Sequence, residues 1–210
     1  MKHIYLVRHG KQDTDLFNED ADLSFIGKRQ AELLRDSIAD YSFDKIYSSI
    51  LKRAIQTSDI LNSNWQLDIE RRTELNEMDW GDFTLCNIVA TTEKYHEFFD
   101  HMTDGREDVP YPNGENGEMA FKRALPVFKE IEKSQYESIL IVCHGGLIRS
   151  ILSGLLCIPF SKKMIFSKYL ENTSITELLY DEDRDIYTLE RLNDFTHLRL
   201  HPELQRSKRA

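Results

Sequence analysis

The chain has 210 residues, of which 40% are hydrophobic and 30% charged, and its formal net charge at pH 7 is −9. A chain of this length and composition can bury a sizeable core, and its negative charge disfavours broad binding to nucleic acids or to a polyanionic membrane surface. With no apolar run near the roughly 20 residues that cross a bilayer, and no signal-peptide pattern at the N-terminus, the sequence predicts a cytoplasmic protein.

Short apolar runs alternate with segments of helical periodicity in the first third of the chain. The sequence predicts strands over 3–7, 43–47 and 67–69, and helices over 28–39 and 51–61. Strands that alternate with helices are typical of βαβ units. We therefore predict an α/β fold, a three-layer sandwich around a mainly parallel sheet.

The same alternation returns in the last part of the chain. Helices are predicted over 121–133 and 147–156, and strands over 138–143, 174–180 and 186–192. Between the two parts, residues 85–118 break the rhythm, with a predicted helix over 88–102 and a stretch over 103–117 rich in Gly, Pro, Asp and Asn. We expect a mostly helical insertion over the C-terminal edge of the strands that forms the rim of a pocket, within a single domain of residues 1–210.

Two histidines stand in matching positions, each directly after a predicted buried strand. Arg8-His9-Gly10 follows the first strand, and His144-Gly145-Gly146 follows the strand over 138–143. Ligands of open α/β sheets bind outside the carboxyl ends of the strands. A single histidine in such a place is usually a packing residue, but two in the same context predict imidazoles on both sides of one substrate atom.

Two further charged positions could serve the same site. Arg53 falls in the first turns of a predicted helix, where free N–H groups and the helix dipole attract anions and a guanidinium adds a fork suited to phosphate. Glu77 lies in an acidic segment, residues 74–81, beside an aromatic residue and a glycine. Taken alone, each of these residues is equally typical of an ordinary surface.

Together these segments resemble the histidine phosphatase superfamily, the phosphoglycerate-mutase-like group, and within it the phosphatase branch. The resemblance rests on four motifs in order, with three supporting segments, and covers nearly the whole chain. The motifs are Arg8-His9-Gly10, residues 48–57, residues 75–81 and Cys143-His144-Gly145-Gly146; the supporting segments are residues 23–31, 112–115 and 193–198.

The resemblance implies a role for each site residue. His9 would be the nucleophile that forms a phosphohistidine, a neutral imidazole attacking phosphorus. Glu77 would protonate the leaving group and then take a proton from water. The phosphoryl oxygens would be bound by Arg8, Arg53 and His144, with contributions from the backbone of Gly145 and from Gln12.

The chain departs from the family pattern in two places. Lys11, Gln12 and Asp15 replace the Glu or Gln, the Thr or Ser and the Asn that often follow the first histidine, and Thr84-Leu85 replaces a Glu-Gly pair. An ionised Asp15 cannot donate a hydrogen bond to phosphate, whereas Gln12 could replace a hydroxyl donor.

Other activities are weighed against a metal-independent phosphatase that acts on a small phosphorylated metabolite. A cofactor-dependent phosphoglycerate mutase would carry arginines in the insertion, but residues 85–118 hold only Lys94 and Arg106 as cations. A non-catalytic module that binds phosphorylated ligands is a second alternative. Two arginines aimed at one point would repel a metal ion, and the cysteines form no metal pair, so no metal and no cofactor is predicted. A homodimer is compatible with the sequence.

Overall fold

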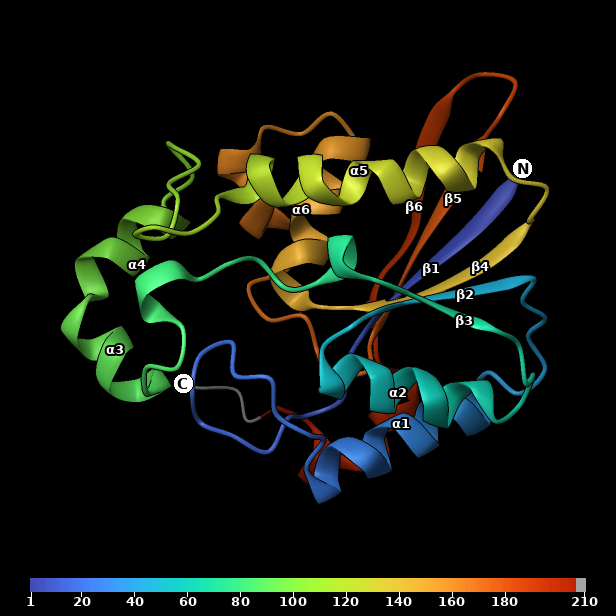
Figure 1. Ribbon diagram of the computed structural model, residues 1–210, viewed down its shortest axis with the longest axis horizontal. Coiled ribbons are helices and arrows are strands. Elements are labelled where there is room, and N and C mark those ends of the chain that lie inside the picture. Colours follow the sequence, from blue (N-terminus) through green and yellow to red (C-terminus); the bar gives the residue numbers. More distant parts are fainter. Residues whose placement is uncertain (207–210) are drawn as a thin grey trace.

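The computed structural model describes residues 1–206, and in this part of the chain six strands form one sheet in the order β3-β2-β4-β1-β5-β6 (Figure 1). Four strands run parallel to one another: β1 (Lys2–Arg8), β2 (Lys45–Ser49), β3 (Ile69–Arg72) and β4 (Ser138–Cys143). At one edge, β5 (Ile175–Asp181) pairs antiparallel with β1, and β6 (Ile186–Asp194) pairs antiparallel with β5. The predicted, mainly parallel sheet is confirmed.

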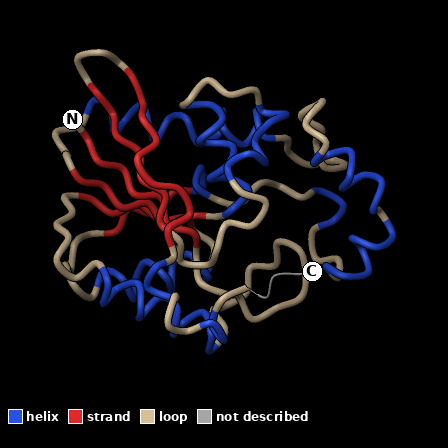
Figure 2. The backbone as a smooth tube through the Cα atoms, turned by 180° about the vertical axis from the view of Figure 1, so that it is seen from behind, coloured by secondary structure: helices blue, strands red, loops and turns tan. Residues whose placement is uncertain are grey.

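Helices cover both faces of the sheet, as the three-layer prediction requires (Figure 2). One face carries α1 (Phe25–Ser37) and α2 (Lys52–Asn62), and the other carries α5 (Gly117–Lys133) and α6 (Gly145–Leu155). The alternation along the central strand β4 shows why both layers are needed. Ile139, Ile141 and Cys143 lie in the core beneath α5 and α6, whereas Leu140 and Val142 lie in the core beneath α1 and α2.

Capping residues move two helix starts away from their predicted positions. The helix predicted over 28–39 is α1, which begins at Phe25 because the Ser24 hydroxyl accepts the N–H of Gly27 (3.1 Å). The helix predicted over 121–133 begins at Gly117, where the Asn116 side chain accepts the N–H of Met119 (2.9 Å). Hydrophobic periodicity finds the buried stripe of a helix, but the cap decides where the helix starts.

The structure also shifts two predicted strands and divides one predicted helix. The strands predicted over 43–47 and 67–69 each begin two residues further along, because Ile46 pairs with Ile69 and Ser49 with Arg72. The helix predicted over 88–102 is divided at Tyr95 into α3 (Ile88–Lys94) and α4 (His96–Thr103). Sequence periodicity does not reveal that break, since Tyr95 leaves helical geometry only through its backbone angles (φ −113, ψ 32).

The insertion lies at the end of the sheet where β1, β2 and β4 finish, with α3 and α4 outermost (Figure 1). Phe83 packs against Tyr95, Phe98 and Phe99, which join the insertion to the rest of the core. At its other end, Asp108 pairs with Lys163 (2.6 Å), and the same carboxylate accepts the N–H groups of Gly117 (3.1 Å) and Glu118 (2.9 Å) at the start of α5. The contacts of Phe83 and of Asp108 therefore hold the insertion against the rest of the protein.

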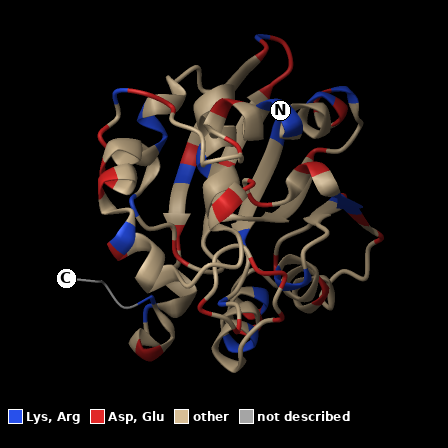
Figure 3. Cartoon of the chain, turned by 60° about the vertical axis from the view of Figure 1, so that its left-hand side comes forward, with Lys and Arg blue, Asp and Glu red and all other residues tan. Residues whose placement is uncertain are grey.

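Basic and acidic residues are both spread over the chain and are not separated by sign (Figure 3). Many are paired: Arg72, at the end of β3, contacts Glu70, Glu74 and Glu130 at 2.7 to 3.0 Å. Within residues 1–206, no helix is both long and apolar enough to cross a bilayer.

Candidate active site

The two strand ends bring His9 and His144 together. β1 and β4 are neighbouring parallel strands, and Arg8 pairs with Cys143 at the last position of their register. The next residue of each strand is therefore a histidine, and the two rings lie 5.0 Å apart at an interplanar angle of 54°. Both side chains are buried, with 4% and 0% of their surface exposed. The paired imidazoles predicted at the carboxyl edge are present.

His9 is held in one tautomer. Its Nδ1 lies 2.7 Å from the carbonyl oxygen of Gly10, and because a carbonyl can only accept, Nδ1 carries the proton and Nε2 keeps its lone pair. Burial and the nearby charges of Arg53 and Arg8 lower the pKa of His9 well below its ordinary value of 6.5. The imidazole is thus neutral, and the lone pair of Nε2 is available to a ligand.

Both arginines are anchored through their outer nitrogens. Arg8 Nη1 donates to the carbonyl of Leu170 (2.5 Å). Arg53, only 2% exposed, donates from Nη1 to the carbonyl of Glu19 (2.8 Å) and from Nη2 to the side chain of Asn18 (3.2 Å). The Nε atom of each arginine and the Nδ1 atom of His144 are buried without a hydrogen-bond partner among the described residues. Buried polar atoms of this kind are costly unless a ligand meets them.

Glu77 faces the start of α6. Its carboxylate accepts the N–H groups of Gly146 (3.2 Å), Leu147 (3.0 Å) and Met78 (2.9 Å). The helix dipole adds to this attraction for a negative charge. Behind it, Arg123 donates to the carbonyls of Glu74 (2.8 Å), Asn76 (3.1 Å) and Glu77 (3.2 Å) and fixes the loop that carries the carboxylate.

Gly146 leaves the space that this carboxylate occupies. A Cβ at this position would lie 2.7 Å from Glu77 Oε1 and 3.1 Å from Met78 Sδ. We expect Gly146→Ala to displace the carboxylate and to lower kcat by about 10- to 100-fold. Because Ala favours helices over Gly by about 1 kcal/mol, part of the stability lost with the hydrogen bonds to Gly146 and Leu147 is regained, so the melting temperature should fall only slightly. A variant of unchanged kcat would show that Glu77 does not need this position.

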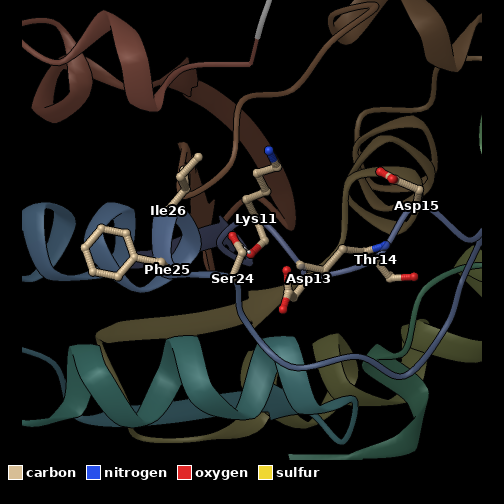
Figure 4. Close-up of a pocket in the computed structure, with 8 residues that line it drawn as sticks. Lys11, Asp13, Thr14, Asp15, Ser24, Phe25 and Ile26 are labelled. Atoms are coloured by element: carbon tan, nitrogen blue, oxygen red, sulfur yellow. Dashed lines mark hydrogen bonds between the residues drawn. The ribbon is translucent and has the colours of Figure 1, made fainter.

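Gly145 and Gln12 are the two other residues that the sequence predicts to contact the substrate. Gly145 is the first residue of α6, and a Cβ there would lie 3.3 Å from Arg8 Nε, so its backbone is within the site. The Gln12 amide donates to the carbonyl of Leu16 (3.5 Å). Gln12 lines a pocket between the loop of residues 11–15 and the start of α1 (Figure 4). Its contact with substrate stays a prediction.

Sequence reasoning missed several residues that hold the site together. Asn18 bridges Arg53 and the carbonyl of Met78 (3.2 Å). Asn172, buried at 4% exposure, donates to the carbonyl of His9 (2.9 Å). Ser49 contacts His144 directly, and Asn76 contacts Ser49. One indication was available: Ser48-Ser49 closes an apolar strand with two hydroxyl groups, and both are fully buried.

Within residues 1–206, no group of three or more His, Cys, Asp or Glu residues is arranged to hold a metal ion. Cys143, beside His144, is buried, and burial raises the pKa of its thiol. Burial therefore favours the protonated thiol over the nucleophilic thiolate.

Comparisons with known proteins agree with this geometry. The family model described as "Histidine phosphatase superfamily (branch 1)" matches residues 4–194. The putative phosphoserine phosphatase 2 of Hydrogenobacter thermophilus is 30% identical over 95% of this chain and 98% of its own length. A mouse 6-phosphofructo-2-kinase/fructose-2,6-bisphosphatase 1 is 32% identical over 72% of this chain, which spans about a third of that protein (32%).

A solved structure supports the same fold. The mycobacterial glucosyl-3-phosphoglycerate phosphatase in complex with inorganic phosphate superposes with a TM-score of 0.84 at 22% identity, over 94% of this chain and 99% of that one. The family match over most of the sequence, together with the paired histidines at the sheet edge, leads to one conclusion: this chain belongs to the histidine phosphatase superfamily.

Proposed function

We propose that this protein is a metal-independent phosphatase that hydrolyses a small phosphorylated metabolite through a phosphohistidine at His9. One observation carries the proposal. The neutral His9, with Nε2 free, stands 5.0 Å from the ring of His144, in a site where Arg8 Nε and Arg53 Nε are buried donors without a partner among residues 1–206. This arrangement suits an anion beside a nucleophile.

In the first step, Nε2 of His9 attacks the phosphorus atom opposite the ester oxygen. A P–N bond forms, the P–O bond to the leaving group breaks, and Glu77 in its acid form gives its proton to the departing oxygen. Arg8, Arg53 and His144 neutralise the charge on the phosphoryl oxygens. Such preorganised donors are each worth about 10²–10³ in rate.

In the second step, the Glu77 carboxylate takes a proton from a water molecule as its oxygen attacks phosphorus. The P–N bond breaks, its electron pair returns to Nε2, and inorganic phosphate leaves. The Nδ1–H bond of His9 to Gly10 holds the ring in the same tautomer throughout (2.7 Å). Both steps use only groups of the protein and water.

The relatives' names support a small substrate. They include phosphoserine phosphatase, fructose-2,6-bisphosphatase and α-ribazole phosphatase, all of which act on small phosphorylated molecules. We extend this substrate class to the present chain, with Gln12 and the backbone of Gly145 as further contacts. The net charge of −9 favours such a ligand over a nucleic acid.

The proposal is tested by phosphate release from a panel of phosphorylated metabolites in excess EDTA. The panel includes phosphoserine, α-ribazole phosphate, sugar bisphosphates, and 3-phosphoglycerate with its bisphosphate primer. Release that is unchanged by the chelator is the expected result. Interconversion of phosphoglycerates in place of release would instead identify a mutase, and ligand binding without turnover would identify a binding module.

A further inference from the structure

His144 is one end of a hydrogen-bonded chain that leads away from the phosphate site. Its Nε2 lies 2.8 Å from the hydroxyl oxygen of Ser49, and that hydroxyl lies 2.8 Å from Oδ1 of Asn76. His144 and Ser49 have no exposed surface. No solvent reaches these two groups, so the chain has to satisfy its donors and acceptors internally.

Two backbone N–H groups set the direction of the protons along this chain. The N–H of Ile50 points at Oδ1 of Asn76 (3.2 Å), and the N–H of Leu51 points at Oγ of Ser49 (3.1 Å). Since a backbone N–H only donates, the Asn76 atom is its oxygen, and an amide oxygen only accepts. The single hydroxyl proton of Ser49 must therefore lie toward Asn76. Ser49 has none left for the imidazole, so His144 Nε2 supplies the proton of that hydrogen bond.

With its proton on Nε2, a neutral His144 has a bare lone pair on Nδ1. That atom is buried and has no partner among the described residues. The Glu77 carboxylate lies at the N–H of Gly146 (3.2 Å), two residues beyond the ring. Arg53 of α2, His9 and Arg8 at the end of β1, and Arg123 of α5 disfavour a positive charge on the ring. Together with burial, which has the largest effect, they lower the pKa of His144 well below its ordinary value of 6.5. The ligand-free site thus holds a neutral imidazole.

A bare Nδ1 cannot face an anionic oxygen favourably, because two acceptors repel each other. We propose that Ser49 and Asn76 fix His144 as its Nε2–H tautomer, so that the site takes up one proton with each phosphoryl ligand, shared between Nδ1 and a phosphoryl oxygen. The phosphoryl nature of the ligand rests on the proposed function. Once the proton is in place, the contact becomes a short, charge-assisted hydrogen bond.

The two active-site histidines then have opposite tautomers. His9 carries its proton on Nδ1 and offers Nε2 to phosphorus, whereas His144 carries its proton on Nε2 and offers Nδ1 to a proton. Ser49 and Asn76 act as positioning residues, since they work through His144. The site consequently selects the singly protonated form of a phosphate ester, or binds the dianion together with a proton from solvent.

The tautomer is measured directly, and without any substrate, by long-range ¹H–¹⁵N correlation spectra of histidine-labelled protein. The His144 signals are assigned by their loss in His144→Gln. A protonated Nε2 with a bare Nδ1 in the native protein is the expected result. A protonated Nδ1 would overturn the proposal, whatever the protein hydrolyses.

The proton uptake is measured by calorimetric titration with phenylphosphonate in buffers of different ionisation enthalpy. The pH is set above the second pKa of this ligand, where its dianion carries no proton; inorganic phosphate is unsuitable because its dianion keeps a hydroxyl. We expect an uptake of about one proton per bound ligand in the native protein. Absence of binding would count against the proposed function, while the spectra would still decide the tautomer.

Asn76→Ala frees the hydroxyl proton of Ser49 to turn toward His144. The ring should then switch to its Nδ1–H form, and proton uptake should fall to about zero. Ser48→Ala is the matched control, because the hydroxyl of Ser48 is equally buried but donates to the carbonyl of Ser49 (2.9 Å). It should behave as the native protein does. An unchanged tautomer in a folded Asn76→Ala would contradict the role of this chain.

Discussion

Replacing His9 with alanine is expected to abolish the turnover of phosphate monoesters, with a loss of about 10⁴-fold or more in kcat. The reason is that the site offers no second nucleophile in the required state. His144 is the nearest imidazole, but its Nε2 is engaged with Ser49 (2.8 Å), and its Nδ1 takes up a proton when the phosphoryl group binds, so neither nitrogen is left to attack phosphorus. Arg8 and Arg53 are donors only.

The measurement combines steady-state rates with trapping of the phosphoenzyme. Denaturation in base after mixing with labelled substrate should preserve a phosphohistidine in the native protein and none in His9→Ala. His96→Ala is the control, since His96 is exposed at the start of α4 and outside the site. Substantial activity, or a labelled protein, after removal of His9 would refute its assignment as the nucleophile.

The lowered pKa of His9 also fixes the sign of its pH dependence. An ordinary histidine loses its lone pair as the pH falls through 6.5, whereas His9 keeps it to well below that pH. A fall in kcat/KM near pH 6.5 is therefore not expected from the nucleophile. Proton uptake at His144 instead predicts that kcat/KM falls as the pH rises above the second pKa of the substrate. The two histidines together favour activity on the acidic side.

The sequence was most informative for candidate site residues that stand at the end of a predicted strand. Arg8-His9 and His144 could be placed at one sheet edge because parallel strands finish on the same side, and a buried strand is visible in its apolar run. Arg53 at a helix start and Glu77 in an acidic segment were noted as candidates, but only the resemblance gave them roles in the site. Nothing in their neighbourhoods distinguished them from a surface arginine or an acidic loop until the fold brought them near the histidines.

The residues that sequence reasoning missed act through contacts distant in the chain. Asn172 reaches the carbonyl of His9 across 163 positions, and Arg123 holds the carbonyl of Glu77 across 46. No periodicity encodes such pairs. The start of α1 at Phe25 and the break at Tyr95 were missed for a related reason: they depend on one side-chain cap and one backbone conformation, not on the hydrophobic pattern.

Glu77→Gln is expected to lower kcat/KM on alkyl phosphates by about 10²–10⁴-fold. Glutamine keeps the size of the side chain and an oxygen for the N–H groups of Leu147 and Met78, but it can neither give nor take a proton. An alkoxide is a poor leaving group and needs that proton. Nitrophenyl phosphate releases a stable anion, so its first step should lose far less.

The comparison of the two esters separates proton transfer from damage to the site. Glu74→Gln is the matched control, because Glu74 lies three residues earlier and pairs with Arg72 (3.0 Å) instead of facing α6. It should leave both rates close to native. In Glu77→Gln, the amide NH₂ meets the N–H of Gly146, which the carboxylate accepts at 3.2 Å, so a small loss of stability is expected in the melting temperature. Because the second step is common to both esters, the comparison uses kcat/KM, which reports the first step. Equal losses of kcat/KM on both esters would exclude Glu77 as the acid and leave it the role of holding the start of α6. A selective loss on alkyl esters would tie the proton to this carboxyl group.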